Sequence, residues 1–334
     1  MRHFLWNILR TLDAAYWRVL RTLDAAYRHT ALFGFIRENR LRQEYIGRAL
    51  KAASGSCFSL IDGFSEVVAE CKKSDTLFVL GSGSSVNRLT SAQWEHVSQH
   101  DSVGFNFWPV HDYIPTFFFF EPSPNAERNR TFYELMKLRS EAYRDVPVVL
   151  DYRWWEDIGG WELEELEHVC VGSRLFLHVP FRFETSDAGY MQKLMRLWLW
   201  LRPYEQRSLC DGIIHHRGTL SALFHFAWAA KYSRIVTIGV DLNDSAYFWE
   251  ELPEAYSCIP HPPNVEQKVG IHGTADPDQY AGNTLPIDEY LFLFQKMFLK
   301  PSRRNEVYVS HASSRLYPNF PVYPPFRDVR DDER

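Results

Sequence analysis

The sequence predicts an α/β fold in which a largely parallel sheet is flanked by helices. Seven short apolar runs after residue 74 are bounded by turn residues, and stretches of helical length lie between several of them, at 190–207 and 219–232. Runs that are apolar throughout indicate strands buried on both faces, which is typical of parallel sheets whose strands alternate with helices. The runs are TLFVLGSG (76–83), DSVGFNFW (101–108), PTFFFFEP (115–122), VPVVLDY (146–152), SRLFLHVP (173–180), RIVTIGVD (234–241) and NEVYVSHA (305–312).

Composition indicates an ordinary packed protein and argues against several function classes. Of the 334 residues, 46% are hydrophobic and 16% aromatic, which is ample for a core. The net charge of -5 gives no general reason to expect nucleic-acid binding. The five cysteines are widely spaced without a CxxC pair, so we expect neither a zinc site nor a disulfide framework. We therefore expect a reducing, cytoplasmic setting. No apolar run reaches about 18 residues, so we expect no transmembrane helix.

The chain divides by composition into a helical segment at 1–50, one α/β domain at 74–327 and a charged tail at 328–334. Within the first segment, LRTLDAAY begins at Leu9 and again at Leu20, almost three helical turns later. Both copies therefore show the same face of an Arg-rich amphipathic helix. Such a helix can lie on an anionic membrane surface through residues 1–30. It can equally dock on its own domain or on a second copy of the chain in a homo-oligomer, and the pattern leaves these alternatives open.

The first strand of the predicted sheet runs into a turn of small residues, GSGSS. This turn lies where a phosphate-binding loop lies in Rossmann-like domains, at the carboxyl end of a strand. No GK[ST] follows it, and it lacks the third glycine of GxGxxG, so it matches neither standard phosphate motif. Spacing alone allows both a ligand-binding loop and a structural corner.

Other chemically capable residues also follow strands or precede a helix. Arg217 and Thr219 stand just before a predicted helix, where N–H groups and a guanidinium favour an anion. His272 lies in a glycine-containing loop without hydrophobic periodicity, a suitable place for a general base. His215 and His216 are interpreted as strand residues facing opposite sides, without a site role. The remaining strand-end candidates are Asn106, Glu121, Asp241 and Tyr247.

The order of these motifs resembles glycosyltransferase family 42, the bacterial lipooligosaccharide sialyltransferases, over roughly residues 75–325. The resemblance implies a GT-A-variant-like single nucleotide-binding domain. It also implies inverting transfer of sialic acid, Kdo or a related 2-keto sugar acid from its CMP form, without a cofactor or metal. The acceptor would be a cell-surface glycan or a lipid-linked saccharide, as in lipopolysaccharide biosynthesis. The counterpart motifs are GSGSSV, GFNFW, RGTLSA, IGVDLN, SAYFW and GIHGTAD.

Carried over residue by residue, the resemblance implies specific roles. His272 would remove the proton of the acceptor hydroxyl, Tyr247 would donate to the departing phosphate, and Arg217 would lie beside the reacting groups. Ser82 stands where the family has Asn, and Asn243 stands where it has a phosphate-binding tyrosine, whose role Asn243 or His311 would have to take. Asp241 is interpreted equally well as a cap of the turn that follows it. The implied donor-binding residues are Gly81, Ser82, Gly83, Ser84, Ser85, Asn106, Thr219, Asp241 and Asn243.

Two other functions fit the same sequence. The patterns DPD (276–278) and DLND (241–244) resemble D-x-D sites for Mg²⁺ or Mn²⁺, which would suit a metal-dependent nucleotide-sugar transferase or a pyrophosphokinase. A CMP donor has a single phosphate and needs little charge neutralisation, so the preferred interpretation predicts full activity in a chelator. The other alternative is a non-catalytic nucleotide- or glycan-binding protein that residues 1–50 recruit to a membrane.

Overall fold

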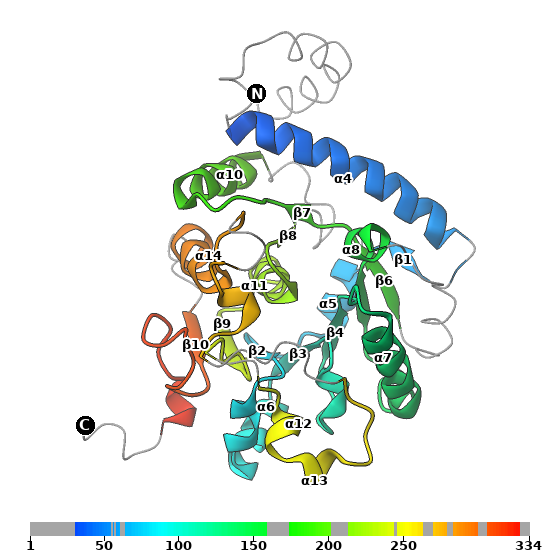
Figure 1. Cartoon of the computed structure of the whole chain (residues 1–334), viewed down its shortest axis with the longest axis vertical. Helices are drawn as coiled ribbons and strands as arrows, with labels where there is room; N and C mark the ends of the chain where they lie inside the picture. The colour runs from blue at the N-terminus through cyan, green and yellow to red at the C-terminus, as the bar shows by residue number, and fades with distance from the viewer. Residues whose placement is uncertain are drawn as a thin grey trace.

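The computed structural model describes residues 31–327 except 55, 57, 61–63, 159–173, 202–212, 244–245, 263–269, 279–282 and 300–305. In this part of the chain, eight parallel strands form one sheet in the order β1-β6-β5-β4-β3-β2-β9-β10 (Figure 1). All seven expected strands are present, and the α/β fold is confirmed. The strands are β1 (Ser59–Leu60), β2 (Thr76–Leu80), β3 (Asp101–Phe105), β4 (Phe117–Phe120), β5 (Val148–Asp151), β6 (Leu175–His178), β9 (Arg234–Ile238) and β10 (Glu306–Val309).

A second, two-stranded sheet was not expected from the sequence. It pairs β7 (Phe181–Arg182) with β8 (Ile214–His215) in parallel. Strands of two residues are too short to show any periodicity, so no sequence pattern identifies them. Their effect is local but important, because they bring His215 and Arg182 to the carboxyl ends of the long strands.

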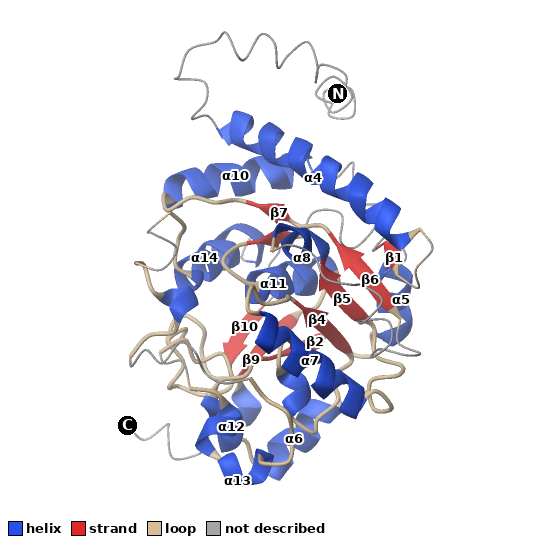
Figure 2. Cartoon of the chain, turned by 45° about the vertical axis from the view of Figure 1, so that its right-hand side comes forward, coloured by secondary structure: helices blue, strands red, loops and turns tan. Residues whose placement is uncertain are grey.

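Helices cover both faces of the main sheet (Figure 2). One face carries α5, α10, α11 and α14, the other carries α6, α7 and α12, and α4 contributes residues to the core on both faces. The helices are α4 (Ala31–Ala53), α5 (Phe64–Cys71), α6 (Ser91–Ser98), α7 (Ala126–Arg139), α8 (Tyr152–Asp157), α10 (Ala188–Leu201), α11 (Thr219–Ala229), α12 (Phe248–Glu251), α13 (Pro253–Tyr256) and α14 (Ile287–Phe294). Short 3-10 turns are η2 (Ser84–Arg88), η3 (Trp108–Val110), η5 (Gly273–Ala275) and η9 (Pro324–Phe326), and η7 (Gln295–Leu299) is a π-helix.

Strand β4 shows why a continuous apolar run indicates a covered sheet. Its four consecutive phenylalanines are all buried. Because side chains alternate along a strand, Phe117 and Phe119 join the core under α11, while Phe118 and Phe120 pack against Phe132 of α7. Both faces therefore need apolar residues at every position.

The described part of the N-terminal segment, residues 31–50, contacts the α/β domain. Helix α4 is packed on the domain, with Phe35 stacked on Phe181 at 5.6 Å between ring centroids. Glu38 of α4 forms a buried ion pair with Arg153, and Arg42 Nε donates to Val179 O at 2.7 Å. The expectation for residues 1–30 and the tail at 328–334 lies outside the described residues.

The sheet contains a topological switch point between β2 and β9. From β2 the chain proceeds through β3, β4, β5 and β6 toward one edge, whereas β9 is followed by β10 toward the other. Ligands of open α/β sheets bind at such a point, outside the carboxyl ends of the strands. The GSGSS turn follows β2, so it lies there. Among the described helices, none is both long enough and apolar enough to cross a membrane.

Candidate functional site

The two glycines of the GSGSS turn allow it to approach the turn after β9. Gly81 N–H donates to Ile238 O at 2.7 Å, and Gly83 N–H donates to Gly239 O at 2.8 Å. A Cβ atom on Gly81 would lie 2.6 Å from Gly239 O, and one on Gly83 would lie 2.5 Å from Asp241 Oδ2. Such separations are far below van der Waals contact. Both glycines are therefore required by the packing of the two loops at the switch point.

The backbone N–H of Ser85 in this turn already has a carboxylate partner in the protein. Asp241 Oδ2 accepts the Ser85 N–H at 3.0 Å, and the Asp241 side chain is buried. Ser84 and Ser85 are buried as well, whereas Ser82 and Gly83 are partly exposed. An anion at the Ser85 amide would meet the negative charge of Asp241. The turn is consequently better suited to hydroxyl and amino groups, such as those of a nucleoside, than to a phosphate.

Tyr247 and Asn243 lie close to the same turn. Tyr247 forms an isolated antiparallel bridge with Gly83, and its ring stacks on Trp249 at 4.4 Å. Its hydroxyl accepts a hydrogen bond from Arg128 Nη2 at 3.4 Å, so a guanidinium stands beside the phenol. Asn243 Nδ2 donates to Ser313 O at 2.6 Å, which assigns its amide a contact with the loop after β10.

Asn106, Glu121 and Thr219 meet at the ends of β3 and β4 and the start of α11. Asn106 has a left-handed backbone with φ 53°, and its Oδ1 accepts the Glu121 N–H at 3.2 Å. The Thr219 hydroxyl donates to Glu121 Oε2 at 2.5 Å and lies 3.4 Å from Asn106 Oδ1. The structure therefore brings Asn106 and Thr219 together, as strand-end placement predicts, with Glu121 between them.

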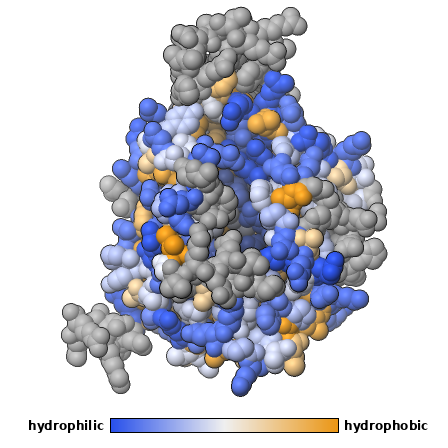
Figure 3. All heavy atoms as spheres, viewed as in Figure 1, coloured by the Kyte–Doolittle hydropathy of each residue, from blue (hydrophilic) through white to orange (hydrophobic). Residues whose placement is uncertain are grey.

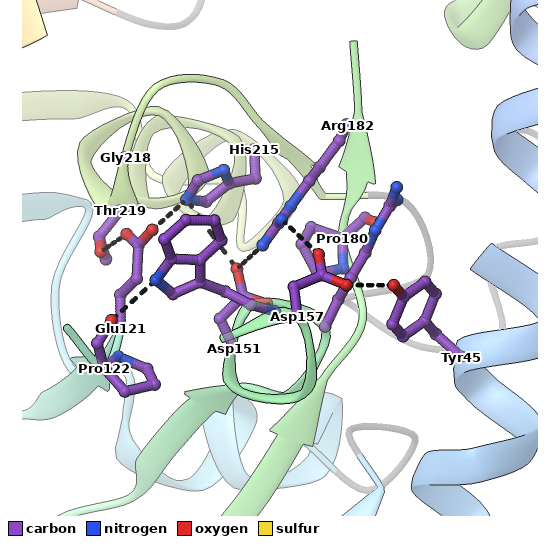
Figure 4. A network of polar contacts seen from close by, with 12 residues as sticks. Tyr45, Glu121, Pro122, Asp151, Asp157, Pro180, Arg182, His215, Gly218 and Thr219 are labelled. Carbon is purple, nitrogen blue, oxygen red and sulfur yellow. Dashed lines mark hydrogen bonds and ion pairs between the residues drawn. The ribbon is translucent and has the colours of Figure 1, made fainter. Parts of the chain in front are cut away.

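A network of charged groups continues from Glu121 along the same edge (Figure 4). His215 Nε2 lies 3.2 Å from Glu121 Oε1 and 3.9 Å from Asp151 Oδ2. Arg182 contacts Asp151 Oδ2 through Nη2 at 3.4 Å and Asp157 Oδ2 through Nη1 at 3.0 Å. In the space-filling view, hydrophilic residues gather around a hollow near the middle of this face (Figure 3). This edge of the sheet is thus lined by ionisable groups.

Sequence reasoning missed most of this network. Asp151 and Glu121 each end an apolar run, and that signal could have identified both, but only Glu121 was considered. Arg182 carries no motif. His215 lies in β8, as the strand interpretation predicts, and its ring faces two carboxylates, a contact that the sequence does not reveal. The ring of His216 lies between Phe183 O and Leu285 O.

The carboxyl group of Glu121 is held in its ionised form. Burial would raise its pKa, but His215, the Thr219 hydroxyl and Arg182 together lower the pKa to about 2, from an ordinary value of 4.5. An unfolded chain therefore binds a proton at a pH where the folded chain does not. The stability that Glu121 contributes is present above about pH 4.5 and is lost as the pH falls toward 2.

We expect the Glu121→Gln variant to lose less stability on acidification than the wild type. Between pH 6 and pH 3 the difference in the loss of unfolding free energy should be about 1–3 kcal/mol, since each unit of pKa shift is worth about 1.4 kcal/mol. Denaturant unfolding at a series of pH values, in chelator, measures it. Identical pH profiles for the two proteins would show that Glu121 is not held ionised.

His272 caps the short turn η5. Its Nδ1 accepts the Thr274 N–H at 3.2 Å and lies 2.9 Å from Thr274 Oγ1, while its backbone N–H donates to Leu242 O at 3.1 Å. The side chain is half-buried. The Leu242 contact ties the His272 loop to the turn after β9, so this histidine stands beside the switch point.

Arg217 holds the His272 loop through backbone carbonyls. Its Nη1 donates to Asp276 O at 2.7 Å and to Thr274 O at 3.2 Å, and its Nη2 donates to Thr284 O at 2.6 Å. Its Nε donates to Thr284 Oγ1 at 2.7 Å. These contacts give Arg217 a positioning role for the loop. The DPD motif forms a turn within this loop, because Asp276 Oδ1 accepts the Asp278 N–H at 3.0 Å.

Comparisons with known proteins find no matching family model and no matching curated protein. Solved structures similar to this chain include the monofunctional alpha-2,3-sialyltransferase Cst-I from Campylobacter jejuni, at 14% identity and TM-score 0.39, covering 76% of this chain and 82% of that one. A variant of the sialyltransferase CST-II in complex with CMP matches at 14% identity and TM-score 0.37, covering 76% and 88%. An apo alpha-2,3-sialyltransferase from Campylobacter jejuni matches at 14% and 0.34, covering 76% and 82%. These proteins are of the kind that the motifs resemble, but TM-scores this low carry no argument about activity.

Proposed function

We propose that this chain is an inverting glycosyltransferase that moves a 2-keto sugar acid, such as sialic acid or a Kdo-like sugar, from a CMP-activated donor. The acceptor would be a cell-surface glycan or a lipid-linked saccharide. The observation that carries the proposal is the meeting of the motif residues at one place. The GSGSS turn, Asp241, Tyr247 and the His272 loop all border the switch point between β2 and β9.

The donor would bind on the β2 and β9 side of this edge. Asp241 and the GSGSS turn suit the hydroxyl and amino groups of a cytidine, because a buried carboxylate accepts hydrogen bonds from both. The phosphate would lie by Tyr247, where the hydroxyl and the guanidinium of Arg128 are 3.4 Å apart. The tyrosine hydroxyl, as a hydrogen-bond donor, and the positive guanidinium would stabilise the negative charge that develops on departing CMP. Departure of CMP would then require no metal ion and no cofactor.

The acceptor would approach from the β4 and β8 side, with His272 as general base. In an inverting transfer one group must remove the acceptor proton while the leaving group is stabilised from the other side. For Nε2 of His272 to take a proton, the ring must carry its own proton on Nδ1. The Thr274 hydroxyl, 2.9 Å from Nδ1, can accept that proton once Nδ1 no longer accepts the Thr274 N–H, so the two Thr274 contacts favour opposite tautomers of His272.

A thermal-shift panel of CMP, CDP, UDP and GDP in the presence of EDTA tests the donor assignment. A ligand that binds the folded chain stabilises it by about 2.7 kcal/mol at one hundred times its Kd. We expect CMP to raise the unfolding temperature selectively. If UDP or GDP raises it and CMP does not, the donor assignment fails and the metal-dependent alternative gains support.

The membrane part of the proposal concerns residues outside the described range. An Arg-rich amphipathic helix at residues 1–30 would place the enzyme on the inner face of the cytoplasmic membrane, near a lipid-linked acceptor. Contact with a second copy of the chain is the alternative. Co-sedimentation with anionic liposomes, with and without residues 1–30, separates the two when the molecular mass is measured alongside.

A further inference from the structure

Three side chains from three strands direct potential ligand atoms toward one point. They are Glu121 after β4, Asp151 at the end of β5 and His215 at the end of β8, and one ligand atom of each lies within 4.8 Å of the others. His215 Nε2 is 3.2 Å from Glu121 Oε1 and 3.9 Å from Asp151 Oδ2. Ligands about 2.0–2.2 Å from a shared ion lie about 3.0–3.4 Å apart when adjacent. Small movements of these side chains would therefore admit one ion.

The remaining carboxylate oxygens are already held by protein donors. Asp151 Oδ1 accepts the Trp154 N–H at 2.9 Å, and Glu121 Oε2 accepts the Thr219 hydroxyl at 2.5 Å. In each carboxylate one oxygen is thus fixed by the fold, while the other faces His215. Hydrogen bonds of this kind orient metal-ligating carboxylates in proteins.

His215 supplies an observation independent of the two acidic residues. Its side chain is 9% exposed, yet Nε2 forms no hydrogen bond with any described residue. The nitrogen lies near both carboxylates, but neither contact has hydrogen-bond geometry. A buried ring nitrogen without a hydrogen bond has a lone pair or a proton that demands a partner. A metal ion between the three groups would provide one.

The charge of the surroundings also favours a divalent cation. Glu121, Asp151 and Asp157 contribute three carboxylates, and Arg182 contributes one guanidinium. The three carboxylates and the guanidinium together have a formal charge of -2. Arg182 contacts Asp151 Oδ2 at 3.4 Å, so it shares that oxygen rather than blocking the point between the three ligand atoms.

We propose that Glu121, Asp151 and His215 bind a first-row divalent cation, Mn²⁺ or Zn²⁺. One imidazole and two carboxylates suit these ions better than Ca²⁺ or Mg²⁺, which prefer all-oxygen sites. Three protein ligands leave coordination positions for water. The ion would join β4 and β5 of the main sheet to β8 of the small sheet, on the acceptor side. The proposal goes beyond the proposed function and does not depend on it, because departure of CMP involves the other side of the edge.

Titration of the full-length, EDTA-treated and desalted protein with Mn²⁺ tests this site directly. Electron paramagnetic resonance measures free Mn²⁺, and no nucleotide or sugar is present, so failure here leaves the CMP assignment untouched. We expect one saturable site per chain, from which Zn²⁺ displaces Mn²⁺. Asp151→Asn and His215→Gln should each weaken binding at least about tenfold, since even the loss of an outer partner costs about 10–100-fold.

Asp278→Asn is the matched control, because Asp278 is an exposed carboxylate of the DPD motif outside this cluster. Its Mn²⁺ affinity should equal that of the wild type. Unfolding temperatures measured in EDTA identify any variant that fails to fold, and Glu121→Gln, which keeps an acceptor for Thr219, then replaces it. The proposal is overturned if the wild type shows no saturable binding, or if the ligand variants bind Mn²⁺ as the wild type does. Either result would leave an ion-pair network only.

Discussion

Replacement of His272 by alanine is expected to lower the rate of transfer about 10²–10⁴-fold, the range that a positioned acid or base contributes. The affinity for CMP should stay close to that of the wild type. The His272 side chain contacts Thr274, and its loop is attached to the turn after β9 by a backbone hydrogen bond to Leu242 that alanine retains. The nucleotide-binding turn therefore keeps its support when the imidazole is removed.

Single-turnover transfer and CMP titration calorimetry measure the two halves of this expectation separately. His261→Ala is the matched control, because His261 is also partly buried but bonds only to Ile259 O among the described residues, at 2.8 Å. Its rate should be unchanged. Full activity of His272→Ala would contradict the general-base role. If the variant instead loses CMP binding while its single-turnover rate at saturating donor stays that of the wild type, His272 contacts the donor and is not the base.

The role of His272 as a base also predicts a dependence of the transfer rate on pH. A base must be neutral to accept a proton, so the transfer rate should fall on the acid side as His272 becomes protonated. Thr274→Val removes the hydroxyl that can accept the Nδ1 proton and retains the backbone N–H that Nδ1 accepts. That variant favours the tautomer with its proton on Nε2, and it should lower the rate while leaving CMP affinity unchanged.

The fold was predictable because burial on both faces leaves a clear record in sequence. Strand β4 requires four consecutive phenylalanines, and the other six expected strands show the same apolar runs. An apolar run cannot identify the two-residue strands β7 and β8. Their extended conformation depends on the residues that pack against them. Residues 31–50 were grouped with the Arg-rich N-terminal segment by composition, yet Arg42 is buried against Val179 and Phe181.

Residues that directly follow a strand could be placed at the site from the strand pattern itself. Asn106, Asp241 and the GSGSS turn lie at carboxyl ends, so topology alone brings them together. Their hydrogen-bond partners could not be read from the sequence. The Ser85 N–H donates to the carboxylate of Asp241, 156 residues away, and this contact supports the nucleoside part of CMP, rather than its phosphate, as the proposed ligand of the turn. His215 was expected in a strand, but its contact with Glu121 could not be read from the sequence.

Replacement of Arg217 by alanine is expected to destabilise the fold by about 3–5 kcal/mol, because a buried polar group that loses its partner costs about 1–3 kcal/mol. Three backbone carbonyls, those of Thr274, Asp276 and Thr284, would each lose a guanidinium hydrogen bond. Arg217→Lys keeps the charge but has a single nitrogen, so it should recover part of the stability. Denaturant unfolding of the three proteins measures the loss.

The kinetic consequence separates a positioning role from a direct contact with the donor. If Arg217 only holds the His272 loop, kcat should fall in Arg217→Lys while CMP affinity is unchanged, since the guanidinium donates to Thr274, Asp276 and Thr284. A direct donor contact predicts the opposite: stability close to the wild type and a large rise in the KM for the donor. A kcat effect that disappears in the His272→Ala background would show that Arg217 acts through His272.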